Sequence, residues 1–169
     1  QPTLNRLAAQ APGSFSAVVL DGSEVVIVAR SVALQDTDVY GSSLGVPARG
    51  VNVPRVLAYG LHLGARLPAH ATSTGRVLLA ALDRVALASW LKSHPLYRVT
   101  PHTQTDPKAF RQVLTEVRSQ DHCVAHEEHE IGVHALAVPL RNQQGRTVAA
   151  LNVVTTAARL GPTTIASHW

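Results

Sequence analysis

Two short runs of aliphatic and β-branched residues near the start of the chain predict a β-hairpin. Residues 16–20 and 24–29 form the runs, and Asp21-Gly22 between them is typical of a tight hairpin turn. The residues that follow, 31–54, have no sustained period and are interrupted by glycines and prolines. This pattern predicts a long loop after the hairpin.

Three stretches follow the spacing of a helix. Residues 2–11 carry apolar side chains at that spacing and predict one helix, and residues 75–91 are rich in Leu and Ala, with Asp83 placed to cap a second helix after a break. Asp106-Pro107 is the strongest helix start in the chain, because an acidic N-cap precedes a proline at the first helical position. The apolar positions that follow it at helical spacing are Phe110, Val113, Leu114 and Val117.

The remaining apolar runs predict strands. Residues 55–61 suggest a third strand after the hairpin, and residues 122–127, 132–140 and 146–155 predict three more, the last two joined by a turn at residues 142–145. Three strands, then helices, then three strands is the order of an α+β fold. The sequence therefore predicts a mainly antiparallel six-stranded sheet flanked by helices.

Composition narrows the class of protein. The chain has 169 residues, of which 46% are hydrophobic and 15% charged, so a single folded domain is expected and disorder is not. Its one cysteine, Cys123, excludes an internal disulfide and favours a reducing, cytoplasmic location. The sequence has no apolar run long enough for a membrane helix and no signal-peptide pattern, and its start at Gln1 without any Met suggests a piece of a longer protein.

The charge pattern does not indicate a nucleic-acid-binding surface. The formal net charge is +4 and the pI is about 9.8, but the arginines are spread along the whole chain and are not interleaved with aromatic residues. We therefore expect that this domain does not grip DNA itself, and DNA binding by the isolated chain stays open only as a minor alternative.

The first candidate site is the start of the predicted helix after His70. Thr72, Ser73, Thr74 and Gly75 stand where unpaired backbone N–H groups and the positive end of the helix dipole favour an anion. A hydroxyl side chain at this place is also the usual helix N-cap. Capping alone and an anion site both fit the spacing.

The second candidate is an amide on a face that should be buried. Val133, Ala135 and Ala137 alternate onto one face of a strand, and Asn152 and Val154 do the same on the next strand. A buried amide needs hydrogen-bond partners, which the protein itself or a ligand carboxylate or hydroxyl can supply. Ala135 is small enough to leave room for a ligand.

The third candidate is a dense group of histidines around the cysteine. His122, Cys123, His126 and His129 suggest a metal- or cysteine-dependent enzyme. Their spacing matches no zinc template, and alternate residues of a strand point to opposite faces. We expect solvated or structural roles, no metal and no cofactor, and keep the enzyme as the alternative hypothesis.

Three ordered blocks of the chain resemble the IclR family of bacterial transcriptional regulators in its C-terminal effector-binding domain. The blocks are residues 64–80, 127–140 and 145–154, and the predicted hairpin resembles the opening of that domain. The resemblance implies a sensor domain of the GAF or profilin-like type over residues 13–169. It also implies that residues 1–12 are a linker helix from an N-terminal winged helix-turn-helix that is absent here.

The resemblance further implies function, partners and site residues. It indicates a regulator, not an enzyme, whose missing N-terminal domain binds operator DNA and which assembles as a homodimer or homotetramer, with no membrane. The motifs are most similar to the branch that controls aromatic-acid catabolism, which implies a small, aromatic carboxylate as effector. Carried over by motif position, the effector pocket comprises Leu67, His70, Ser73, Thr74, Gly75, Ala125, Val133, Ala135, Asn152 and Val154.

Overall fold

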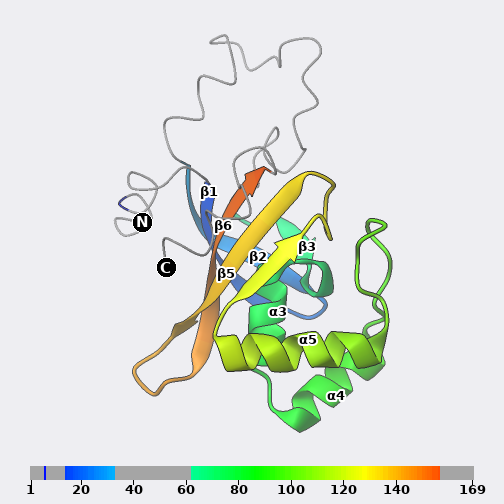
Figure 1. Cartoon of the computed structure of the whole chain (residues 1–169). Helices are drawn as coiled ribbons and strands as arrows, with labels where there is room; N and C mark the ends of the chain where they lie inside the picture. Colours follow the sequence, from blue (N-terminus) through cyan, green and yellow to red (C-terminus); the bar gives the residue numbers. More distant parts are fainter. Residues whose placement is uncertain (1–5, 7–13, 33–61, 157–169) are drawn as a thin grey trace.

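Six antiparallel strands form one sheet, and the helices lie on one side of it. The computed structural model describes residues 6, 14–32 and 62–156, and the sheet runs in the order β3-β2-β1-β6-β5-β4 (Figure 1). The strands are β1 (Ser14–Asp21), β2 (Glu24–Val32), β3 (Arg66–Pro68), β4 (Cys123–His126), β5 (Val133–Arg141) and β6 (Thr147–Thr156). This arrangement confirms the predicted α+β class.

The predicted hairpin is present, and its turn needs a glycine. β1 and β2 pair through Asp21 and Glu24, and Gly22 between them has φ +62°, a conformation that side chains with a Cβ rarely adopt. β2 extends to Val32, so the first two residues of the predicted long loop are strand. The rest of that loop, the strand predicted at 55–61 and the helix predicted at 2–11 (Arg6 apart) lie outside the described residues. The third strand in the structure is β3, which pairs with β2.

The helices begin where side chains cap them. The structure contains a short 3₁₀ helix η2 (Ala69–Ala71) and the α-helices α3 (Ser73–Ala80), α4 (Arg84–Ser93) and α5 (Pro107–Gln120). The carboxylates of Asp83 and Asp106 accept hydrogen bonds from Ala86 N at 2.8 Å and Ala109 N at 2.7 Å, as expected for N-caps. Asp83 restarts the helical phase, so Val85 faces solvent instead of continuing the apolar stripe of the preceding helix.

The core lies between the sheet and α3. All eight residues of α3 are buried, and the helix packs against β5, β6 and α5. Pairing of β5 with β6 sets Ala135 opposite Val154 and Ala137 opposite Asn152, which places these side chains on one face, as predicted. No helix in the described part of the chain is long and apolar enough to cross a membrane.

Candidate functional site

A pocket opens where the start of α3 meets the strands β4, β5 and β6. Its empty space is about 440 Å³, part of it open to solvent. The lining residues are Leu67, Ala71, Thr72, Ser73, Thr74, Ala125, Glu128, His129, Glu130, Val133, Ala135, Asn152 and Val154.

The first turn of α3 contains both a capped amide and donors without a partner. Thr72 is the N-cap, and its Oγ1 accepts a hydrogen bond from Gly75 N at 3.2 Å. The side chain of Ser73 is buried, with 1% of the residue exposed, and no described residue bonds its hydroxyl. Among the described residues none accepts a hydrogen bond from the amides of Ser73 and Thr74 either. Three hydrogen-bond donors thus remain at the positive end of a helix that borders the pocket.

Asn152 supplies a second unpaired polar group on the opposite wall. Its Oδ1 is buried and bonds no described residue. Asn152 has two direct cross-strand neighbours, Ala137 on β5 and Ser16 on β1, and neither bonds its Oδ1. A buried polar atom left without a partner costs about 1–3 kcal/mol, so such atoms are rare in folded proteins. Two of them in one pocket indicate a place for a polar ligand.

The structure does not bring His70 and Gly75 into the pocket. The His70 ring points away from it, its Nε2 bonding Tyr97 O at 2.8 Å and its ring packing edge-on against Tyr97. Gly75 lies under η2, where an added Cβ would sit 2.0 Å from Ala69 O. The glycine is therefore required for helix packing, and its amide already bonds Thr72. The other predicted site residues all line the pocket.

The turn after β4 forms the wall that the sequence reasoning missed. Glu128, His129 and Glu130 line the pocket together with Ala71 and Thr72. The missed signal lay in α3, where one arginine, Arg76, stands among small and apolar residues. A buried arginine requires an acidic partner, and the paired acidic residues of the turn were available.

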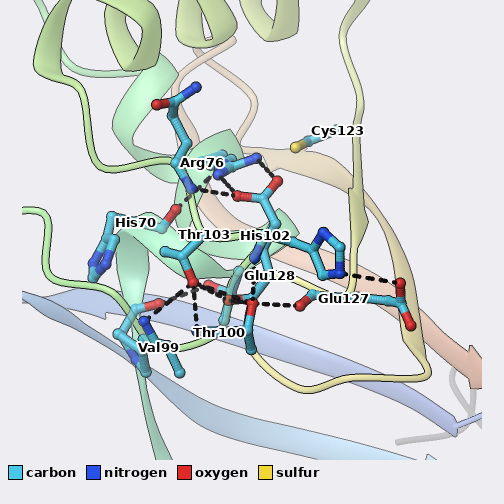
Figure 2. Close-up of polar contacts among 12 residues, drawn as sticks. His70, Arg76, Val99, Thr100, His102, Thr103, Cys123, Glu127 and Glu128 are labelled. Atoms are coloured by element: carbon cyan, nitrogen blue, oxygen red, sulfur yellow. Dashed lines mark hydrogen bonds and ion pairs between the residues drawn. The ribbon is translucent and has the colours of Figure 1, made fainter.

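That partner is Glu128. Arg76 is 3% exposed and makes a two-pronged ion pair with the carboxylate of Glu128, while its Nε donates to His70 O at 3.0 Å (Figure 2). The charge of Glu128 is thereby compensated, although this residue lines the pocket. Burial lowers the pKa of His129, and Glu130 opposes this shift only in part. The neutral form of the His129 imidazole is therefore favoured in the ligand-free pocket.

The histidine and cysteine group is dispersed in the structure. His122 bonds Gln120 O, Cys123 is buried in the core, and His126 points to the other face of the sheet, where its Nδ1 lies 2.7 Å from Nδ1 of His134. His129 alone reaches the pocket. Burial raises the pKa of the Cys123 thiol to about 11, which keeps it protonated and a poor nucleophile. No three metal-ligating side chains converge within residues 14–32 and 62–156.

Comparison with known sequences places the chain among bacterial regulators. Residues 49–167 match the family model described as the C-terminal part of the bacterial transcriptional regulator IclR. The Pca operon regulatory protein of Acinetobacter baylyi is 48% identical over 159 residues, which are 94% of this chain and 51% of that protein. The p-hydroxybenzoate hydroxylase transcriptional activator of the same organism is 47% identical, over 96% of this chain and 54% of its own length. The chain spans about half the length of these curated relatives.

Solved structures share the fold. The inducer-binding domain of the PobR transcription factor from Acinetobacter, a double mutant in complex with 3-hydroxybenzoic acid, superposes with a TM-score of 0.81 at 45% identity. The match covers 99% of this chain and 87% of that one. The C-terminal domain of the E. coli regulator KdgR, at 23% identity and a TM-score of 0.74, supports the fold alone.

Proposed function

The chain belongs to the IclR family of transcriptional regulators and is an effector-binding domain of that type, and on this basis we propose that its pocket binds a small, hydroxylated aromatic carboxylate. The observation that carries the proposal is the pair of unpaired buried polar atoms, Ser73 Oγ and Asn152 Oδ1, on the wall of a single pocket. The relatives support the same chemical class, since one is named for p-hydroxybenzoate hydroxylase and another was solved with 3-hydroxybenzoic acid.

The carboxylate belongs at the first turn of α3. There the Ser73 hydroxyl and the amides of Ser73 and Thr74 can donate to it, and the helix dipole adds about 0.3–2 kcal/mol of attraction. The negative charge of Glu128 does not cancel this attraction in full, because the positive charge of Arg76 neutralises the Glu128 carboxylate. A neutral His129 takes up a proton more readily beside a bound anion, and so becomes a further donor.

The ring belongs against the apolar lining, and its hydroxyl near Asn152. Leu67, Val133 and Val154 offer aliphatic surface, while the small Ala125 and Ala135 leave space above the sheet. A phenolic hydroxyl can donate to Asn152 Oδ1 and so give the orphan acceptor its missing bond. An acid that lacks the hydroxyl leaves Asn152 unpaired and binds more weakly.

Titration calorimetry with 4-hydroxybenzoate, 3-hydroxybenzoate, benzoate and propionate tests the proposal. We expect a hydroxybenzoate to bind best, Ser73→Ala to weaken all carboxylates by about tenfold, and Asn152→Leu to weaken the hydroxybenzoates more than benzoate. Gln112→Leu, an amide-to-leucine change on the exposed side of α5, is the matched control and should change nothing. Silence across the panel, or an unaltered affinity in the Ser73→Ala, Asn152→Leu double variant, would refute the assignment.

We further propose that the whole regulator acts on DNA without catalysing a reaction. In this proposal the operator is bound by a separate N-terminal domain, effector binding shifts the arrangement of subunits in a dimer or tetramer, and residues 1–12 transmit the change. Small-angle scattering with and without saturating effector should show two different curves. Identical curves would contradict the coupling. Zinc or iron in stoichiometric amount after dialysis would instead favour the alternative metal-dependent enzyme.

A further inference from the structure

The loop between α4 and α5 touches both walls of the pocket without lining it. We call residues 97–104 the bracket loop. On one side, Tyr97 O accepts a hydrogen bond from His70 Nε2 at 2.8 Å, and His70 belongs to η2, which leads directly into Thr72 and Ser73. Burial lowers the pKa of His70, so its ring is a neutral donor to this carbonyl. The bracket loop is thus fixed to the α3 wall.

On the other side, the bracket loop holds the turn that follows β4. Thr100 Oγ1 donates to Glu127 O and Thr103 Oγ1 to Glu128 O, both at 2.7 Å (Figure 2). Gln104 N donates to the Glu128 carboxylate at 3.2 Å. Thr100 and Thr103 are both buried, so these bonds are shielded from water.

Thr103 is the centre of the bracket loop. Its Oγ1 accepts hydrogen bonds from Val99 N at 3.1 Å and Thr100 N at 2.8 Å and donates its own hydrogen to the turn. One hydroxyl therefore fixes the loop and the turn together. The ion pair between Arg76 and Glu128 ties the same turn to α3 and closes the connection between the two walls.

From this geometry we infer that the bracket loop sets the distance between the start of α3 and the turn at residues 127–130, and so determines which ring sizes the pocket accepts. This inference rests on the proposed function. Thr100 and Thr103 are positioning residues in this scheme, since neither lines the pocket. Loss of their hydroxyls removes the bonds to the carbonyls of Glu127 and Glu128 and loosens the turn at residues 127–130, which the Arg76–Glu128 pair then holds with less support. The pocket then admits a wider aromatic acid at the expense of its fit to a single ring.

Valine and serine variants separate positioning from bulk stability. Thr103→Val keeps the shape of the side chain and removes the hydroxyl, whereas Thr103→Ser keeps the hydroxyl. Thr100→Val and Thr100→Ser repeat the test at the second hydroxyl, should Thr103→Val fail to fold. Thr115→Val is the matched control, because Thr115 donates to Arg111 O at 3.0 Å on the exposed side of α5, remote from the pocket.

Two measurements decide the inference. Without ligand, Thr103→Val should speed amide hydrogen exchange over residues 127–132 by about tenfold, while Thr103→Ser and Thr115→Val stay within about twofold of the unaltered chain. With ligand, the preference for 4-hydroxybenzoate over 6-hydroxy-2-naphthoate should fall by about tenfold in Thr103→Val and stay unchanged in Thr103→Ser and Thr115→Val. General destabilisation of the fold weakens the binding of both acids alike and leaves the ratio of their affinities unchanged.

Different results would refute the proposed ligand class and the proposed role of the bracket loop. If the unaltered chain binds neither acid, the proposed ligand class is refuted, and the exchange measurement alone decides whether the bracket loop holds the turn. Equal exchange in Thr103→Val and Thr103→Ser would overturn the inference. So would an unchanged ratio of affinities in a Thr103→Val protein that binds both acids.

Discussion

Replacing Glu128 by glutamine removes the charge that compensates a buried arginine. Arg76 is 3% exposed, and besides its ion pair with Glu128 the guanidinium donates to His70 O and lies over the Phe110 ring, 5.6 Å from its centroid. Removing one partner of a buried ion pair typically costs about 3–5 kcal/mol, because the remaining charge stays in a medium that solvates it poorly. We expect Glu128→Gln to lower the free energy of unfolding by about 3 kcal/mol or more, and the melting temperature by about 6–12 °C.

Asp121→Asn makes the same chemical change in an exposed ion pair. Asp121 bonds Arg141 in the same two-pronged manner, but the two side chains are 52% and 45% exposed. Such pairs contribute about 0–1 kcal/mol. Asparagine also tolerates the left-handed backbone at this position, where φ is 63°. The difference between the two losses in stability therefore measures how much burial adds to the cost of removing the negative charge.

Urea unfolding followed by far-ultraviolet circular dichroism measures both changes. The Arg76→Met, Glu128→Leu double variant should recover most of the loss, since two packed apolar side chains replace the pair. In that variant His70 O loses a donor and Gln104 N loses an acceptor, so a deficit of about 2 kcal/mol should remain. If Glu128→Gln costs no more than Asp121→Asn, the ion pair is not buried in solution and the reasoning fails.

Three further predictions concern the fold around the pocket. Gly75→Ala should destabilise the chain by about 3 kcal/mol or prevent folding, because its Cβ would lie 2.0 Å from Ala69 O; a melting temperature within about 2 °C of the unaltered chain would contradict this. Cys123, 3% exposed and with a pKa of about 11, should react with a disulfide reagent at least about a hundredfold more slowly in the folded chain than in urea, and equal rates would show an accessible thiol. Burial lowers the pKa of His129 below its ordinary 6.5, so the unfolded chain binds more protons than the folded chain near this pH. The free energy of unfolding should therefore fall as pH drops through 6.5, and His129→Asn should reduce the slope of stability against pH. An unchanged slope would show that other groups cause the pH dependence.

Local cues predicted the elements that have their own start and stop signals. The Asp106-Pro107 start led directly to α5, and Asp21-Gly22 to the β1–β2 hairpin. Val85 shows the limit of periodicity, because it continues the helical spacing of Leu78 and Leu82 in the sequence but lies exposed on α4. The cap at Asp83 starts a new helix with a new phase, and spacing counted across such a break has no structural meaning.

The candidate site was predictable where one element carries the signal. The hydroxyl residues at the start of α3 and the lone amide of Asn152 each stood out in their own segment, and the structure brings both to one pocket. His70 and Gly75 belong to the same motif but have structural roles, because the residues of a motif can be required for packing as well as for contact with a ligand. The turn at Glu128 escaped prediction for the opposite reason, since its role depends on Arg76, 52 residues away.

By itself, the order of residues determined the class of fold, the faces of the strands and the helix ends, because these depend on neighbours within a few positions. Only the tertiary structure decided which polar groups find partners. The Thr72 hydroxyl caps α3 and the Thr103 hydroxyl bonds a distant turn, while the Ser73 hydroxyl and the Asn152 Oδ1 are buried without a partner among the described residues. Pairing of a hydrogen-bond donor with an acceptor requires both at one point in space, and folding alone brings them there.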